Sequence, residues 1–287
     1  MSLGVIDIGS NTVRLAVYDT TTFKVIENGV NYAGLISYVE AGKISDEGLE
    51  ILCSVVLEMK AICEKINCDR YYAFATASLR DIEDKESLIK TVADKTGVKM
   101  EIISGEKEAE CDYLGLKLHY NTDTGAVFDL GGGSAQLITF EDGKVTANVS
   151  KKIGALKLYK TFVKDTFPTY LEEVKIREYI KSEISGFKSK EHEFIFAMGG
   201  AASAIKKLYR TLFGEKKEDF TVLELKSFLE VPENIINSVI PERLYTIRPA
   251  LIAIEEICNT LKTDRIKCVT CGVRDGMMYK LMEKRDL

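Results

Sequence analysis

Two segments of this chain align without a gap, residues 5–19 (VIDIGSNTVRLAVYD) and residues 127–141 (VFDLGGGSAQLITFE). Their aspartates, Asp7 and Asp129, are 122 positions apart. In each segment an apolar run reaches an aspartate and a glycine, turns at small residues and continues with alternating apolar residues. This pattern is typical of two strands joined by a tight turn. The repeat predicts a chain of two similar α/β halves.

The chain of 287 residues is long enough for two domains of ordinary size. The polar run at residues 121–123 predicts the junction, which gives domains of residues 1–120 and 121–275. We expect a terminal helix at residues 276–287, which can pack back on the first domain. A Rossmann unit is disfavoured because it would place a helix directly after the glycines, and the Walker pattern GxxxxGK[ST] is absent from the sequence.

Hydrophobic spacing and capping residues predict the other main elements. Helices are expected at residues 45–66, 85–96, 106–120, 172–184, 201–213 and 249–262. Short strands are expected at residues 71–76, 100–103, 194–197 and 269–272.

Composition narrows the class of protein. A formal net charge of −5 argues against a general nucleic-acid partner, because duplex binding needs a broad excess of basic residues. The start of the chain has neither a basic leader nor a long apolar run, so we expect a cytoplasmic protein without membrane contact. The seven cysteines are an odd number, and His119 and His192 are the only histidines. Buried reduced thiols are therefore favoured over a disulfide framework or a zinc site, including at Cys268 and Cys271.

The two turns are candidates for phosphate binding. A glycine turn directly after a strand lets backbone N–H groups face phosphate oxygens, because no Cβ is in the way. One candidate turn is Gly9, Ser10, Asn11 and Thr12, and the other is Gly131, Gly132, Gly133 and Ser134. A single such turn is weak evidence, since plain hairpins contain glycine turns. Two in the same register, each preceded by a carboxylate, favour phosphate binding.

Asp7 and Asp129 stand where the first strand of each hairpin ends. Paired carboxylates beside bound phosphate are the usual way to hold a hydrated Mg²⁺ ion. The alternative is that each aspartate accepts backbone hydrogen bonds in its own turn. Because the arrangement occurs twice, we expect Mg²⁺ as the cofactor.

The motifs DIGSNT (residues 7–12), SGEKEA (104–109) and DLGGGS (129–134), in this order and spacing, resemble the exopolyphosphatase and guanosine pentaphosphate phosphohydrolase family, Ppx/GppA. ATASLR (75–80), AMGGAASA (197–204) and CGVRDG (271–276) extend the resemblance over nearly the whole chain. The resemblance implies the duplicated actin and hexokinase-like (ribonuclease H-like) fold, with a cleft between the domains. It also implies a short two-domain form of the family.

The resemblance also assigns roles to single residues. It makes Glu108 the residue that activates water, although this glutamate by itself could equally complement the helix dipole. It favours a phosphate contact for Arg80 over a surface ion pair with Asp81 or Asp84, and gives Arg274 the same role with less support. Gly199 and Gly200 suit phosphate approach and close packing equally.

This chain departs from the family's pattern at Gln136, where the family usually has a glutamate metal ligand. Gln136 can still coordinate a metal but adds no negative charge. Residues 28–35 also lack the family's basic side chains, which points to weak binding of long chains. A basic track is a less favoured alternative to a solvated surface for Lys151, Lys152, Lys157, Lys160 and Lys164.

The expected activity is release of terminal orthophosphate from inorganic polyphosphate by in-line attack of water. Guanosine pentaphosphate is the alternative substrate, and Gln136 motivates a second alternative, a phosphate-chain or nucleotide sensor that has lost turnover. A kinase or ATPase of the same superfold is a third. The sequence leaves a homodimer open.

Overall fold

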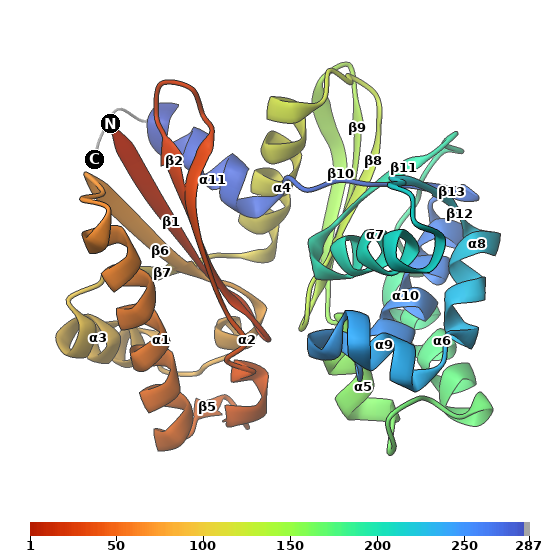
Figure 1. Ribbon diagram of the computed structural model, residues 1–287, viewed down its shortest axis with the longest axis horizontal. Helices are drawn as coiled ribbons and strands as arrows, with labels where there is room; N and C mark the ends of the chain where they lie inside the picture. The colour runs from red at the N-terminus through yellow and green to blue at the C-terminus, as the bar shows by residue number, and fades with distance from the viewer. Residues whose placement is uncertain (284–287) are drawn as a thin grey trace. The chain divides into compact units, whose positions relative to one another are not determined.

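The computed structural model describes residues 1–283, which form two compact units (Figure 1). Unit 1 joins Met1–Leu118 to the C-terminal segment that starts at Val273, and unit 2 is His119–Gly272. Each unit has its own sheet and its own hydrophobic core.

The sheet of unit 1 has the strand order β3-β2-β1-β6-β7. Its strands are β1 (Ser2–Ile8), β2 (Val13–Asp19), β3 (Val25–Asn31), β6 (Arg70–Ala75) and β7 (Met100–Ile102). The first three strands are antiparallel, whereas β6 and β7 run parallel to β1. A small separate ladder pairs β4 (Val39–Glu40) with β5 (Lys43–Ile44), after the 3₁₀ helix η1 (Leu35–Tyr38).

Helices pack on both faces of this sheet. They are α1 (Asp46–Lys65), α2 (Ala77–Arg80), α3 (Lys85–Thr96), α4 (Gly105–His119) and α11 (Val273–Glu283). Alternate residues of β1 face opposite sides. Ile6 packs in the cluster that contains residues of α1 and α3, while Val5 packs with Cys111 of α4 and Met277 of α11. The C-terminal helix therefore belongs to the core of unit 1. Residues 284–287 of the predicted terminal helix lie outside the described residues.

The sheet of unit 2 has the order β10-β9-β8-β11-β13-β12. Its strands are β8 (Gly125–Leu130), β9 (Ala135–Glu141), β10 (Lys144–Lys151), β11 (Ile195–Met198), β12 (Asp219–Thr221) and β13 (Arg265–Cys268). Again the first three are antiparallel, β11 and β13 run parallel to β8, and β12 pairs antiparallel with β13 at the edge.

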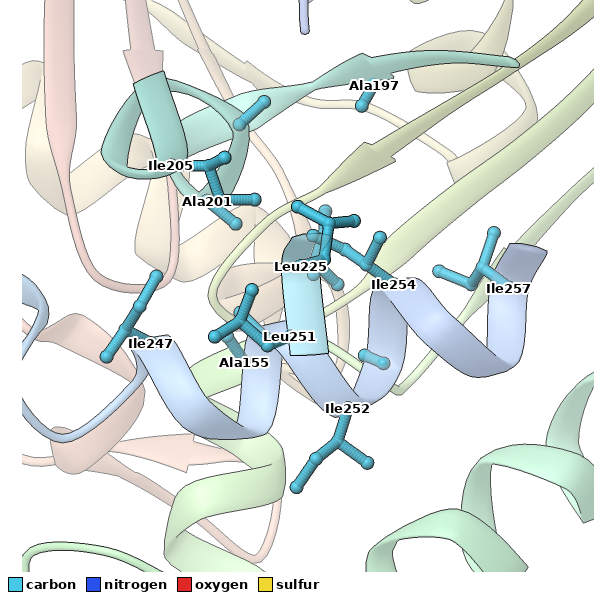
Figure 2. Close-up of a cluster of buried hydrophobic side chains, with 14 of the residues drawn as sticks. Ala155, Ala197, Ala201, Ile205, Leu225, Ile247, Leu251, Ile252, Ile254 and Ile257 are labelled. Carbon is cyan, nitrogen blue, oxygen red and sulfur yellow. The ribbon is translucent and has the colours of Figure 1, made fainter. Parts of the chain in front are cut away.

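The helices of unit 2 include α10, which is buried along most of its length. They are α5 (Ala155–Phe162), α6 (Tyr170–Ile184), α7 (Gly199–Phe213), α8 (Val222–Ser227), η2 (Phe228–Glu230), α9 (Glu233–Val239), η3 (Pro241–Arg243) and α10 (Ile247–Thr260). Figure 2 shows Leu251 and Ile254 of α10 among side chains that include Ala155 of α5 and Ile205 of α7. Helix α6 starts at a capping box in which Thr169 and Glu172 satisfy each other's backbone N–H groups.

Strands β3-β2-β1-β6-β7 and β10-β9-β8-β11-β13 have the same order and the same directions. The duplicated two-domain α/β fold predicted from the repeat is therefore confirmed.

One predicted strand was wrong. Residues 269–272 are not a strand, and the last parallel strand is β13, four positions earlier. Arg265 and Lys267 alternate with the buried Ile266 and Cys268, so charged side chains interrupt the apolar run that sequence reasoning looked for. Val269 adds one further backbone bond, to Ala197 at 2.9 Å, before the chain leaves the sheet.

Candidate functional site: two braced glycine turns and an ion-paired glutamate

The turn between β1 and β2 is closed by a bond from the Gly9 N–H to the Thr12 carbonyl, at 3.1 Å. A Cβ on Gly9 would lie 2.8 Å from that carbonyl oxygen, so this position needs glycine. The segment after β3 braces the turn: Gly34 N–H donates to the Asn11 carbonyl and Ile36 N–H to the Ser10 carbonyl, both at 3.0 Å.

The turn between β8 and β9 repeats these bonds at equivalent positions. Gly131 N–H donates to the Ser134 carbonyl at 3.0 Å. The segment after β10 braces the turn, since Gly154 N–H donates to the Gly133 carbonyl at 3.3 Å and Leu156 N–H to the Gly132 carbonyl at 3.0 Å. The duplication therefore includes the brace as well as the hairpin.

The brace determines which way the turn amides face. In a planar trans peptide the carbonyl and the following N–H point to opposite sides. Because the Ser10 and Asn11 carbonyls bond the brace, the N–H groups of Asn11 and Thr12 are directed away from it. The same holds for Gly133 and Ser134 in unit 2. Each turn thus presents consecutive amides on one side, an arrangement that binds anions.

The aspartates differ in their cross-strand neighbours. Asp7 pairs in register with Arg14, and Asp129 pairs with Gln136. Directly opposed residues on antiparallel strands have Cβ atoms about 5 Å apart, so each neighbour lies beside its aspartate. Sequence reasoning missed Arg14, although it occupies the position in the first repeat that Gln136 occupies in the second.

Gln136 is buried and its side-chain nitrogen is in use. Nε2 donates to Ser134 Oγ and to Ser150 Oγ, both at 3.0 Å. This nitrogen therefore ties the end of the glycine turn to β10. Of the two polar atoms of the amide, the carbonyl oxygen is the one suited to a cation.

Asp129 lies over the start of α7. Gly199 has φ +90°, and a Cβ there would be 2.3 Å from Asp129 Oδ1 and 2.6 Å from the Leu130 carbonyl. The glycine therefore makes room for the carboxylate. Within residues 1–283 the structure has no group of three His, Cys, Asp or Glu side chains arranged to hold a metal. Mg²⁺ commonly binds one or two carboxylates together with water and substrate phosphates, so a carboxylate cradled in this way fits the ion.

Gly200 makes room for a second charged group. A Cβ on Gly200 would lie 1.8 Å from Nη2 and 2.5 Å from Cζ of Arg243. Arg243 is a buried residue, with 8% of its surface exposed. Sequence reasoning did not single it out, because it lies in the short η3 far from any glycine motif.

Glu108 and Arg80 form an ion pair in unit 1, between Glu108 Oε2 and Arg80 Nη2. The Arg80 Nε also donates to the Ile103 carbonyl at 3.0 Å, which fixes the guanidinium beside the first turn of α4. Side-chain exposure is 9% for Glu108 and 20% for Arg80, so the pair is largely shielded from water. The structure thus brings together the predicted base and one predicted phosphate ligand.

Arg274 starts α11 and lies against β2. Its Nη1 is 3.5 Å from the Leu15 carbonyl, which is a long contact for a hydrogen bond. The next residue, Asp275, accepts a bond from the Tyr18 hydroxyl at 3.2 Å. Burial, followed by the nearby Asp275 carboxylate, raises the pKa of Tyr18.

Two serine hydroxyls are buried at the same end of the unit 1 sheet. The Oγ atoms of Ser10 and Ser78 have no hydrogen-bond partner among the described residues. Ser10 follows β1 and Ser78 follows β6, and these strands are parallel neighbours. Buried hydroxyls are normally satisfied, so a site that handles phosphate is a reasonable setting for them.

Two further predictions concern the C-terminal cysteines and the membrane. Cys268 and Cys271 are buried and reduced, and burial raises the pKa of Cys268 to about 12. Among the helices described, none has the length and apolar composition needed to cross a membrane.

The fold and these turns define a duplicated α/β protein with one braced glycine turn in each half. A family model described as the Ppx/GppA phosphatase family matches residues 25–285. The chain therefore belongs to the Ppx/GppA phosphatase family, as its motifs predicted.

Named relatives agree with this assignment. Exopolyphosphatase 1 of Mycobacterium tuberculosis is 29% identical over 191 residues, which cover 64% of this chain and 56% of that protein. The guanosine-5′-triphosphate,3′-diphosphate pyrophosphatase of Photobacterium profundum is 23% identical over 97% of this chain and 59% of its own. This chain thus spans little more than half the length of the curated relatives it matches.

Solved structures share the fold over the full chain. The Ppx/GppA family member of Aquifex aeolicus superposes with a TM-score of 0.81 at 23% identity, covering 100% of this chain and 99% of the other. An exopolyphosphatase from Cytophaga hutchinsonii superposes with a TM-score of 0.86 at 18% identity, with coverage of 99% and 98%. At these identities the likeness describes the fold alone.

Proposed function

We propose that this protein is an exopolyphosphatase, which releases terminal orthophosphate from inorganic polyphosphate by attack of water on the terminal phosphorus. The observation that carries the proposal is the pair of turns braced by corresponding bonds. Each presents consecutive amides and one aspartate, which is the chemistry that a phosphate chain with its cation requires.

Glu108 is the residue proposed to activate water. It lies in the first turn of α4 and is held by Arg80 in a partly dehydrated setting. A carboxylate oxygen in such a position can accept a proton from an attacking water as the water approaches phosphorus. A guanidinium beside it can hold phosphate oxygens in two parallel hydrogen bonds, so Arg80 orients the group that the water attacks.

The remaining residues bind and orient the chain of phosphates. The turns donate backbone N–H bonds, and Arg274 adds a guanidinium at the start of α11. Asp7, Asp129 and the carbonyl oxygen of Gln136 are the groups proposed to hold Mg²⁺. When bound, the ion would neutralise negative charge on the phosphates. A general base cannot supply this neutralisation.

Guanosine pentaphosphate is the second candidate substrate, because one named relative covering 97% of this chain is a guanosine-5′-triphosphate,3′-diphosphate pyrophosphatase. Both substrates end in a phosphoric anhydride, so the same residues would act on either. The absence of Lys and Arg from residues 28–35 favours a short substrate in both cases.

The test is phosphate release by the purified protein from polyphosphate of defined length and from guanosine pentaphosphate, each with and without Mg²⁺. We expect Mg²⁺-dependent release, faster with polyphosphate. Binding of either compound without any release would favour the sensor alternative that Gln136 motivates. Release that requires ATP would favour a kinase or ATPase instead.

A further inference from the structure

We propose that Cys63 and Cys68 form a reversible disulfide when a peroxide reaches the protein, which makes the C-terminal end of α1 an oxidative modification site. Cys63 lies beside Gly4 near the start of β1, whereas the glycine turn follows Ile8 at the other end of that strand. The modification site is therefore separate from the proposed phosphate site and is tested without reference to phosphate release.

The first step is the backbone geometry with which α1 ends. Asn67 has φ +51°, and its N–H donates to the Glu64 carbonyl at 3.0 Å. The Cys68 N–H donates to the Cys63 carbonyl at 2.9 Å. One residue in the left-handed region together with these two nested bonds is the Schellman motif, in which the side chains of the residues joined by the outer bond commonly meet. In this chain both of those residues are cysteines.

The second step is the contact between the two thiols. The Cys63 thiol hydrogen-bonds the Cys68 side chain, and burial, followed by this neighbour, raises the pKa of Cys63 to about 12. Cys68 Sγ in turn donates to the Arg70 carbonyl at 3.0 Å. A disulfide needs Cα atoms about 4.4–6.8 Å apart, and two sulfurs that already share a hydrogen bond need little backbone movement to form one.

The third step is the difference in access to the two sulfurs. A Cβ on Gly4 would lie 2.9 Å from Cys63 Sγ, so the glycine makes room for this sulfur against β1. Only 1% of the surface of Cys63 is exposed. All seven cysteines lie within residues 1–283, and Cys68 is the one among them that is not buried. A dissolved oxidant therefore reaches Cys68 first, and the partner beside it is Cys63.

The chemistry balances with hydrogen peroxide as the oxidant. The Cys68 thiolate attacks one peroxide oxygen, the O–O bond breaks, and the leaving hydroxide takes up the thiol proton to become water, so that Cys68 becomes a sulfenic acid. The Cys63 sulfur then attacks the Cys68 sulfur, the S–O bond breaks, and the hydroxyl leaves as water with the Cys63 proton. Both thiols are oxidised and the peroxide is reduced to water. A reducing dithiol reverses the bond by exchange.

The experiment treats the whole protein with hydrogen peroxide, blocks the remaining thiols by alkylation and digests the chain with trypsin. Trypsin cleaves after Lys65, between the two cysteines, so the disulfide joins peptide 61–65 to peptide 66–70. Mass spectrometry is expected to show the linked pair about 2 Da lighter than the sum of the two reduced peptides. Dithiothreitol added before alkylation should remove the linked pair.

Two variants test the order of events. Cys68→Ser should slow the peroxide-dependent loss of the Cys63 thiol by about tenfold, because a buried thiol is inert on its own. Cys53→Ala is the matched control, since Cys53 is a buried cysteine of the same helix, and it should leave the yield of linked peptides within about twofold of wild type. Circular dichroism checks that both variants fold, and the linked peptides of the wild type test the pairing even if one does not.

Two results would overturn the proposal. In the first, peroxide carries Cys68 on to a sulfinic acid while Cys63 remains a thiol. In the second, the Cys63 thiol is lost equally fast in wild type and Cys68→Ser. Either result would mean that the two cysteines do not act as a pair.

Discussion

The turn of unit 1 and the turn of unit 2 have the same backbone but different side chains. Both are closed by one N–H to carbonyl bond and share two bracing bonds at positions that correspond through the repeat. The turn of unit 2 accepts two more, from the N–H groups of Ala155 and Lys157. Beside the aspartate, however, unit 1 has the cation of Arg14 where unit 2 has the neutral Gln136. Unit 1 also carries Glu108, which lies in the first turn of α4. The comparison teaches that both halves kept the backbone geometry of the turn while the side chains beside it diverged.

The largest expected effect comes from removing the carboxylate of Glu108, which only unit 1 carries. Glu108→Gln keeps shape and hydrogen bonding but removes the proposed base, so phosphate release should fall by about 10²–10⁴-fold. Glu106→Gln is the matched control, because Glu106 lies in the same helical turn and is exposed. Phosphate release is measured with saturating substrate and Mg²⁺. Near wild-type activity in Glu108→Gln would remove this residue from the mechanism.

The two braces offer the next test. A Cβ on Gly154 would lie 2.4 Å from the Gly133 carbonyl carbon, whereas one on Gly34 would meet nothing closer than Ser37 Oγ at 3.9 Å. Gly154→Ala should therefore push the second turn out of place, lower stability by about 1–3 kcal/mol and abolish most activity.

Gly34→Ala is the control for that variant. Gly34 has φ +58°, so alanine there costs about 1–2 kcal/mol of stability without moving the turn. Urea denaturation should show similar losses in the two variants, and phosphate assays should show a loss of activity in Gly154→Ala alone. Equal activities would mean that the brace does not position the turn.

Gln136→Glu sharpens the comparison at the aspartates. It places a second carboxylate opposite Asp129, so Mg²⁺ should raise the melting temperature more than in wild type and half-saturate activity at up to about tenfold lower concentration. Ser150→Ala removes one partner of Gln136 without adding charge and serves as the control. An unchanged response to Mg²⁺ would place the ion away from Gln136.

The smallest expected effect concerns pH. Both histidines belong to unit 2, and burial lowers the pKa of His192 below its ordinary value. The unfolded chain then binds more protons than the folded one, so this group's contribution to stability rises with pH up to about 6.5 and is constant above. His192→Asn should flatten the slope of unfolding free energy between about pH 5 and pH 6.5, as measured by urea titration. An unchanged slope would contradict the assignment.

The sequence alone determined the duplicated α/β fold and most of its elements, because hydrophobic period and capping residues are local signals. Helix α3, for example, ends at Thr96 before the left-handed Gly97, as its composition predicted. The shift of the last parallel strand to β13 shows the limit, since Arg265 and Lys267 are placed by sheet pairing rather than by local preference. The motifs also selected Glu108 and the glycine turns, whose spacing is local.

Tertiary structure alone decided which distant side chains meet. Arg80 and Glu108 are 28 positions apart, and their pairing depends on β6 and β7 being neighbours, because Arg80 follows β6 and Glu108 follows β7. The Arg243 guanidinium lies beside Gly200 only because α7 and the residues on either side of η3, Ile240 and Leu244, share the core of unit 2. No local pattern records such contacts, because they arise from packing energies summed over the whole unit rather than from the preferences of neighbouring residues.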